Sequence, residues 1–342
     1  MRILMVTPSF YPAIGGVETH VRRVSEALSG RGHQVSVLTH SEEPGEEELG
    51  PITVHRLPRT NWRRAWQGSR PYIADADVVQ CHDAYSFLHF YLPSVYLPPR
   101  RPVFATFHGY ESYPIRSEAM RWRKFVRRRV RDALCMGEFI CRRYGTKCFA
   151  VSYGGADPMA EPPPLPGKSG ALFIGRLAED TSIMFYLHAL SILRSEYGQT
   201  LPVTIVGDGP MRQPAEMYAK ANRLDARFVG TVQNPAEYLR LADIAFVSGY
   251  LSIWQALAAR RVVFAVYENE LKRDYVQCFP EAEKTLMMAG EAEELADQIN
   301  HYLGNRESYE DRRERGARLA ATNTWDRVAN LYESMYRAHG VT

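Results

Sequence analysis

Two adjacent glycines, Gly15 and Gly16, stand where the sequence changes from a buried strand to a helix. An apolar run at 2–7 precedes them, and valine and leucine recur at helical spacing over 17–28. The first turn of a helix carries unpaired N–H groups and the positive end of the helix dipole, and glycine lets a ligand approach the backbone closely. The pair therefore predicts a binding site for a phosphate or a sugar. The alternative is a loop that needs glycine only for its backbone dihedrals.

Strands and helices alternate along the chain, and this alternation predicts a doubly wound α/β fold with parallel sheets. The first series of short apolar runs, typical of buried parallel strands, lies at 2–7, 34–40, 52–56, 77–81, 103–108 and 148–152. A second series follows at 171–175, 203–207, 227–230, 244–248, 262–266 and 285–288, and a helix at 324–339 ends the pattern. Two Rossmann-like domains are therefore expected.

The stretch between the two series is rich in proline and glycine, which indicates an interdomain linker. We expect an N-terminal domain at 1–157, a linker at 158–170, a C-terminal domain at 171–320, and a final helix at 321–342 that packs back toward the N-terminal domain. Because open α/β sheets bind ligands outside the carboxyl ends of their strands, the cleft between the domains is the expected site.

Composition excludes several classes of protein. The chain has 342 residues, of which 24% are charged and 45% hydrophobic, and its net charge of +3 favours neither general nucleic-acid binding nor bulk membrane binding. No apolar run has the length of a membrane span. The five cysteines show no C-x-x-C and no pairing pattern, which predicts a reducing cytoplasm. Without a His/Cys ligand cluster in the sequence, we expect no metal and no cofactor.

Two common nucleotide-binding motifs are missing. The spacing G-x-G-x-x-G is absent, and the second strand ends in Thr39 and His40 where a dinucleotide fold places an acidic residue for the ribose. The Walker A pattern is also absent. Both absences disfavour a nicotinamide-dependent enzyme and a P-loop enzyme.

Seven short motifs follow one another at predicted strand ends: "IGGVETHV" (14–21), "TFHGYE" (106–111), "VSYGGADP" (151–158), "FIGRL" (173–177), "VGDGP" (206–210), "FVGTV" (228–232) and "ADIAFVS" (242–248). In this order the chain resembles glycosyltransferase family 4 over nearly its whole length. The resemblance implies a GT-B fold, in which two Rossmann-like domains face a central cleft. It also implies a retaining, metal-independent hexosyltransferase of carbohydrate biosynthesis that uses a nucleotide-sugar donor.

The resemblance also assigns roles to single residues. His108 matches a histidine that faces the donor sugar, and, neutral or protonated, it would bind a sugar hydroxyl or stabilise charge. Arg176 matches the arginine that reaches the diphosphate, a task that suits a forked and permanently charged guanidinium. The remaining donor contacts implied by the matching motifs are Gly15, Gly16, Gly209, Thr231 and Val232. A strand-end histidine, a surface ion pair and a structural turn are the alternatives for His108, Arg176 and Gly209.

Two departures from the family pattern concern the donor site. Thr181 stands where family members carry a second diphosphate-binding lysine. Of the family's Glu-x7-Glu pair, the first glutamate has no counterpart and Gln255 replaces the second, a change that keeps one hydrogen-bond acceptor for the ribose. Three residues, Tyr250, Leu251 and Ser252, should still open the following helix and offer N–H groups to phosphate.

These departures leave three hypotheses open. The first is a retaining transferase with a modified donor site. The second is a catalytically degenerate homologue that binds a nucleotide sugar or a partner protein. The third, a different Rossmann enzyme such as a sugar-nucleotide epimerase, is disfavoured by the motif order and Arg176. For the transferase we expect a sugar, lipid-linked or small-molecule acceptor and no nucleic acid.

A basic stretch, "RWRKFVRRRVRDALC" (121–135), predicts a helix of the N-terminal domain, which receives the acceptor in GT-B enzymes. Arg127, Arg128 and Arg129 are its densest part. They suit an anionic acceptor or anionic lipid headgroups, and hence a cytoplasmic protein in peripheral contact with the inner face of the membrane. A solvated helix face is the alternative.

Overall fold

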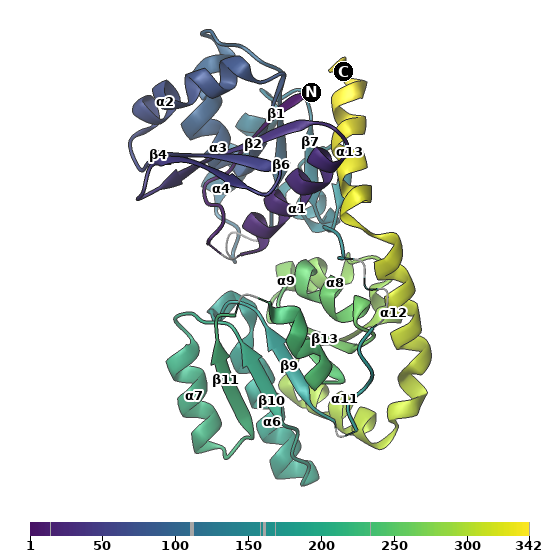
Figure 1. The fold of residues 1–342 in the computed structure, drawn as a ribbon. Helices are drawn as coiled ribbons and strands as arrows, with labels where there is room; N and C mark the ends of the chain where they lie inside the picture. The colour runs from purple at the N-terminus through teal and green to yellow at the C-terminus, as the bar shows by residue number, and fades with distance from the viewer. Residues whose placement is uncertain are drawn as a thin grey trace. The chain divides into compact units, whose positions relative to one another are not determined.

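The computed structural model describes residues 1–341 except 14, 110–112, 158, 160, 161, 168 and 233, and it divides into two compact units. The first unit comprises Met1–Gly154 and Trp325–Thr342, and the second comprises Gly155–Thr324 (Figure 1). Four residues of the predicted linker therefore lie outside the described residues. The chain returns to the first unit for its last helix.

In the part of the first unit that the structure describes there are eight strands: β1 (Arg2–Val6), β2 (Gln34–Ser41), β3 (Gly45–Leu49), β4 (Ile52–Pro58), β5 (Val78–His82), β6 (Val103–Phe107), β7 (Ala133–Met136) and β8 (Ala150–Ser152). Its helices are α1 (Gly16–Gly30), α2 (Trp62–Asp75), α3 (Asp83–Ser86), the π-helical η1 (Phe87–Tyr91), the 3₁₀ turn η2 (Leu92–Val95), α4 (Ser117–Arg127), α5 (Glu138–Tyr144) and α13 (Trp325–Ala338).

The first sheet has the strand order β3-β4-β2-β1-β5-β6-β7-β8, and only β3 runs antiparallel to its neighbour. Every residue of β5 and β6 is buried, as expected for parallel strands covered on both faces. The final helix α13 lies beside α1 (Figure 1). The chain order reverses between β1 and β5, so the ends of these strands form the switch point at which such sheets bind ligands.

Two strands of this sheet differ from the sequence prediction. The edge strand β3, Gly45–Leu49, consists mostly of exposed glutamates, so it lacks the apolar signal of a buried strand. The predicted helix at 121–135 is wrong in its second half, because α4 ends at Arg127 and Ala133–Met136 form β7. The buried run that follows the arginines pairs with β6 and β8 and leaves no room for a longer helix.

The described residues of the second unit form six strands: β9 (Ala171–Ile174), β10 (Val203–Val206), β11 (Ala226–Gly230), β12 (Ile244–Val247), β13 (Val262–Val266) and β14 (Leu286–Ala289). Its helices are η3 (Glu179–Thr181), α6 (Ile183–Tyr197), α7 (Arg212–Ala221), η4 (Pro235–Leu241), α8 (Tyr250–Ala258), α9 (Glu270–Gln277), α10 (Ala282–Thr285), α11 (Ala292–Gly304), η5 (Arg306–Tyr309) and α12 (Glu310–Thr322), where η3, η4 and η5 are 3₁₀ turns.

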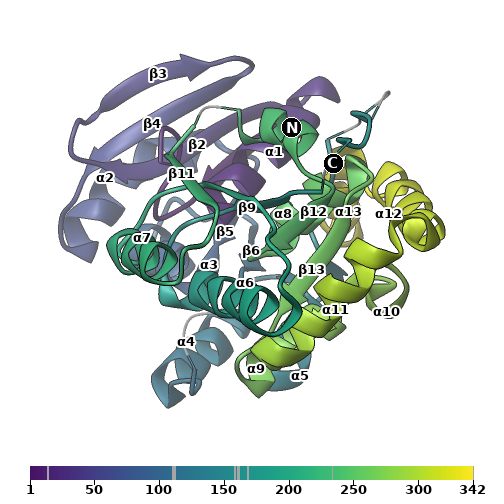
Figure 2. The same cartoon turned by 90° about the horizontal axis from the view of Figure 1, so that it is seen from below.

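The second sheet is wholly parallel, with the order β11-β10-β9-β12-β13-β14. This is the doubly wound Rossmann order 3-2-1-4-5-6, whose switch point lies between β9 and β12. Figure 2 shows α6 and α11 side by side, and their apolar faces join the buried residues of the strands in one core. Both units are therefore Rossmann-like, as the alternating pattern predicted.

Candidate functional site

Three buried histidines meet at the carboxyl ends of β5 and β6 in the first unit. His82 ends β5, His108 follows β6, and the Nδ1 atom of His82 lies 2.9 Å from Nε2 of His108. The ring of His20, from α1, lies 4.9 Å from that of His108. The sequence interpretation named only His108. The signals for the other two were a histidine at a strand end and a histidine one turn past the glycine pair.

Tyr332 of the C-terminal helix α13 orients this cluster through hydrogen bonds. The hydroxyl of Tyr332 lies 2.9 Å from Nε2 of His20 and 2.8 Å from Oγ1 of Thr106 on β6. Gln80 continues the network by donating from Nε2 to the same threonine at 3.0 Å. Because the helix lies far from these residues in sequence, its part in orienting His20 could not be inferred from motif spacing.

All three imidazoles are neutral at physiological pH. Burial lowers the pKa of His20 to about 3 and holds the pKa values of His82 and His108 well below the ordinary value. Among the described residues, Nδ1 of His20 and Nε2 of His82 have no hydrogen-bond partner. The cluster therefore brings no positive charge to a ligand.

Two charged side chains hold the backbone of His108 in place. The Nη2 atom of Arg123, on α4, donates to the carbonyl oxygen of His108 at 2.9 Å and to that of Gly109 at 3.1 Å. The carboxylate of Asp83 accepts the His108 N–H at 2.8 Å, and Asp83 itself has a left-handed φ of 65°. Arg123 belongs to the basic stretch interpreted as a surface, yet it is buried and shapes the histidine site.

The three arginines predicted to face a membrane or acceptor have different surroundings. Arg127 donates from Nη2 to the carboxylate of Asp132 at 2.7 Å, and the guanidinium of Arg129 lies 3.5 Å from the centre of the Phe125 ring. Only Arg128 of the three is exposed. The basic run is thus not one solvated helix face, and contact with anionic lipid stays a prediction. Among the described helices, none has the length and apolar character needed to cross a bilayer.

The glycine pair opens α1 as predicted. Gly15 is its N-cap in an extended conformation with φ −166°, and Gly16 is the exposed first residue of the helix. Among the described residues, a Cβ added at Gly15 would meet only the carboxylate end of Glu18, and one added at Gly16 would meet nothing within 4 Å. The described part of the fold therefore does not require glycine at position 16.

In the second unit, Arg176 follows β9 and is paired with an acid. Its Nη2 atom lies 2.7 and 3.0 Å from the two carboxylate oxygens of Asp180, and 62% of its side chain is exposed. An exposed ion pair of this kind contributes little to stability. The guanidinium is therefore accessible to a diphosphate, which has to compete with Asp180 for it.

The Thr181 hydroxyl bonds to the backbone of its own loop, and the assignment of this residue to the donor site stays a prediction. Its hydroxyl is buried, lies 2.6 Å from the carbonyl oxygen of Arg176 and 2.7 Å from that of Ala178, and accepts the Ala178 N–H at 3.2 Å. These contacts close the short turn η3. Thr181 is therefore a structural residue of the loop that carries Arg176.

Gly209 also has a structural explanation. Its φ is +152°, and an added Cβ would lie 2.3 Å from the carbonyl oxygen of Leu177. The Leu177 N–H donates to the Asp208 carbonyl at 2.9 Å, so this turn packs directly on the loop of Arg176. The turn after β10 supports the arginine loop whether or not Gly209 touches a donor.

The N-terminus of α8 is partly capped by the protein itself. The Tyr250 N–H donates to the Tyr275 hydroxyl at 2.8 Å, and the Ser252 Oγ atom accepts the Gly249 N–H at 3.2 Å. Tyr250 is buried and stacks on Tyr275. The prediction of uncapped N–H groups is therefore wrong for Tyr250. Among the described residues we find no cap for the N–H groups of Leu251 and Ser252, which precede the first intrahelical bond of α8.

Three further predicted donor contacts are exposed or half-buried. Gln255 is half-buried on α8, Thr231 is exposed after β11, and Val232 beside it is half-buried. Their roles stay predictions.

A lysine that the sequence analysis missed lies at the switch point of the second sheet. Lys272, on α9, donates from Nζ to the carbonyl oxygen of Ser248 at 2.8 Å and lies 3.5 Å from that of Asp180. These two carbonyls belong to the loops after β12 and β9. Only 8% of the residue is exposed, and burial lowers its pKa to about 8. No motif marks this lysine, because it reaches the site from a helix that follows a third strand.

The cysteines also differ from expectation. Cys135, Cys141 and Cys148 form a cluster whose sulfur atoms all lie within 4.8 Å of one another. The prediction that the chain holds no Cys ligand cluster is therefore wrong for these three, whose spacing of five and six intervening residues matches no common metal motif.

Comparison with known families agrees with the motif order. Residues 14–160 match the family described as Glycosyltransferase Family 4, and residues 168–305 match the family described as Glycosyl transferases group 1. Similar solved structures include sucrose-phosphate synthase from Thermosynechococcus elongatus, with a TM-score of 0.80, 17% identity and coverage of 99% of this chain and 98% of that one. HepE from Anabaena in complex with UDP-glucose has a TM-score of 0.76 and 14% identity, with both chains covered completely.

Curated relatives match over short segments only. The chain is 49% identical over 39 residues to a subunit of phosphatidylinositol N-acetylglucosaminyltransferase from Homo sapiens, which is 11% of this chain and 8% of that protein. The corresponding protein of Arabidopsis thaliana is 38% identical over 66 residues, which is 18% of this chain and 14% of that protein. The matched segments thus span a small part of each relative.

Proposed function

Because the chain belongs to the family 4 glycosyltransferases of the GT-B fold, we propose that it moves a sugar from a uridine diphosphate sugar to an acceptor hydroxyl with retention at the anomeric carbon. The solved relatives that hold UDP or UDP-glucose support the uridine nucleotide. The short matches to phosphatidylinositol N-acetylglucosaminyltransferase make UDP-N-acetylglucosamine the first donor to test.

The observation that carries this proposal is the position of Lys272. It lies between the loops that follow β9 and β12, where a doubly wound sheet binds its ligand, and the loop after β9 also carries Arg176. The donor diphosphate would then have two cations in reach, although Thr181 replaces the family's usual lysine. In this proposal Lys272 takes over the role of the missing residue from a different element.

The diphosphate would bind as the leaving group of the reaction. Arg176 would exchange the Asp180 carboxylate for a phosphate and bind it through two parallel hydrogen bonds. The N–H groups of Leu251 and Ser252 would add donors at the N-terminus of α8. Charge stabilisation of this kind acts where negative charge develops in the transition state, so it accelerates the transfer itself.

Retention follows when the acceptor hydroxyl enters on the face from which the diphosphate leaves. The departing phosphate oxygen takes the acceptor proton, and no side chain forms a covalent intermediate. In the first unit, His108 and Gly16 are our candidates for contact with the transferred sugar. The neutral imidazole would exchange a hydrogen bond with a sugar hydroxyl through Nδ1, because its Nε2 atom is bonded to His82.

A catalytically degenerate donor-binding protein is the second candidate. The pairing of Arg176 with Asp180 and the presence of Gln255 where the family has a glutamate favour it, because both reduce the interactions available to a donor.

Donor turnover distinguishes the two candidates. The protein is incubated with UDP-N-acetylglucosamine, UDP-glucose, and GDP- and ADP-sugars, and release of the nucleoside diphosphate is followed together with the anomeric configuration of the product by NMR. We expect UDP release from a UDP-sugar with retained configuration. Binding of a UDP-sugar by calorimetry without release of UDP, with or without added sugar and lipid acceptors, would support the degenerate protein instead.

A further inference from the structure

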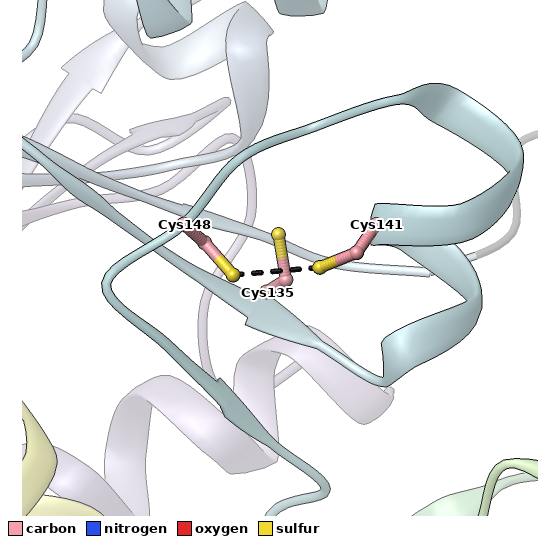
Figure 3. A group of neighbouring side chains, drawn as sticks. All are labelled: Cys135, Cys141 and Cys148. Carbon is pink, nitrogen blue, oxygen red and sulfur yellow. Dashed lines mark hydrogen bonds between the residues drawn. The ribbon is translucent and has the colours of Figure 1, made fainter.

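Three cysteines of the first unit bring their sulfur atoms together away from the histidine cluster. Cys135 lies on β7, Cys141 on α5 and Cys148 in the segment before β8. Figure 3 shows the three side chains pointing into one space, with the sulfur atoms of Cys141 and Cys148 3.4 Å apart. All three sulfur atoms lie within 4.8 Å of one another. The catalytic proposal uses none of them.

The backbone explains why the cysteines converge. Gly137, with a φ of 103°, turns the chain from β7 into α5, and Gly145, with a φ of 61°, turns it out of the helix. The Phe149 N–H then donates to the Ala133 carbonyl at 2.7 Å, which brings the returning chain beside the start of β7. The segment from β7 through α5 to β8 therefore brings the three sulfur atoms together at the edge of the first sheet.

We propose that Cys135, Cys141 and Cys148 form a three-thiolate binding site for a thiophilic d¹⁰ metal ion, Zn²⁺ or Cu⁺. Thiolates select these ions over Mg²⁺ or Ca²⁺. At a Zn–S distance of about 2.3 Å, the sulfur atoms of a tetrahedral site lie roughly 3.8 Å apart. The present spacing approaches this value, so the site closes around an ion by small side-chain movements.

The surroundings fit the charge and access that such a site requires. Binding of Zn²⁺ releases three thiol protons and leaves a complex with one negative charge, and Arg143 and Lys147 are neighbours in sequence that can balance it. Cys141 and Cys148 are only half-buried, which gives an ion a path inward. Among the described residues no fourth Cys, His, Asp or Glu completes the group, so water would occupy the fourth position of Zn²⁺, whereas Cu⁺ would be three-coordinate.

The bound ion would connect α5 to the strands on either side of it. Among the described strands only β7 pairs with the three-residue edge strand β8. A metal held by β7, α5 and the segment before β8 would stabilise this edge in the folded state alone. The site is therefore structural, and it is independent of donor binding in the second unit.

Metal titration of the reduced, chelator-treated full-length protein tests the proposal. Zn²⁺ is titrated in competition with a chromogenic zinc chelator, Cu⁺ is titrated without oxygen against a chromogenic copper chelator, and Co²⁺ is used to detect thiolate-to-metal charge-transfer absorption. We expect one ion per chain. In Cys141→Ser and Cys148→Ser the affinity should fall at least about a hundredfold, because even the loss of an outer-shell partner typically weakens binding 10- to 100-fold.

Cys278→Ser is the matched control, since Cys278 is also half-buried but lies in the second unit. It should bind the ion like the unmodified protein, and the added ion should raise the melting temperature of both proteins but not that of Cys141→Ser. Binding that persists unchanged in Cys141→Ser would overturn the proposal. So would the lack of stoichiometric binding of either ion, or a Cys141–Cys148 disulfide found after thiol trapping in protein that holds no metal.

Discussion

The substitution Lys272→Met tests the donor site most directly. Methionine approximates the length of lysine and removes the ammonium that donates to the Ser248 carbonyl at 2.8 Å. In the proposal this ammonium also contacts the diphosphate of UDP. A charge-assisted hydrogen bond of that kind contributes about 1.5–3 kcal/mol, so the variant should bind UDP roughly 10- to 150-fold more weakly. Isothermal titration with UDP measures the loss. Lys220→Met, at an exposed position on α7, is the matched control and should leave the affinity unchanged.

The pH dependence of UDP binding separates a direct contact from a structural role of Lys272. Burial lowers the pKa of this lysine to about 8, whereas the charges of Asp180 and Glu268 raise it. Only the protonated ammonium attracts a diphosphate, so the affinity of the unmodified protein should fall as the pH rises through about 8. In Lys272→Met this fall should be absent, because the titrating group is gone.

Stability should respond to pH in the opposite direction. The folded-state pKa of Lys272 lies below the ordinary value of 10.5, so the unfolded chain binds more protons between about pH 8 and that value. The contribution of this group to the stability of the ligand-free protein therefore rises with pH over the window in which binding weakens. Unfolding caused by the titration of Lys272 itself consequently cannot account for the predicted loss of affinity. The reasoning is refuted if Lys272→Met binds UDP as tightly as the unmodified protein, or if it keeps the same pH dependence.

Two further substitutions probe other residues of the proposed function. Arg176→Ala should weaken UDP binding more than Gln255→Ala does in parallel titrations. The reason is that a lost charged contact costs about 1.5–3 kcal/mol, whereas a lost neutral hydrogen bond costs about 0.5–1.5 kcal/mol. Equal losses would contradict the assignment of Arg176 to the diphosphate. Gly16→Val should change the unfolding free energy by less than about 0.5 kcal/mol but should lower UDP-sugar turnover. Gly30→Val, at the other end of α1, is the control and should leave turnover intact. Unchanged turnover in Gly16→Val would remove Gly16 from the site.

Much of the fold was predictable from local patterns. Fully apolar runs such as 262–266 marked the parallel strands, since strands covered on both faces need apolar side chains throughout. The apolar pattern failed to predict strands whose own side chains, or whose neighbours in sequence, are charged. The edge strand β3 is charged, and β7 follows directly on a run of arginines that suits a helix.

The candidate site was less predictable, because its residues come from separate elements. His108 and Arg176 follow strands within motifs, so the sequence indicated them. Lys272, His20 and Tyr332 reach their sites from helices, and only the packing of those helices brings them near. Thr181 shows the reverse case, because a residue at the expected position in sequence uses its hydroxyl to close a turn.

A glycine can be needed for the fold or for the approach of a ligand, and these two reasons cannot be told apart in the sequence. At Gly209 the chain itself demands glycine, because an added Cβ would lie 2.3 Å from the Leu177 carbonyl oxygen and φ is +152°. At Gly16 the backbone is the start of a helix, and no described residue lies within 4 Å of an added Cβ, so neither a positive φ nor a described contact selects glycine there. A residue that loses conformational entropy on folding without a packing advantage needs another reason to be present. In our proposal, close approach of a ligand to the first turn of α1 supplies that reason for Gly16, and the turnover of Gly16→Val tests it.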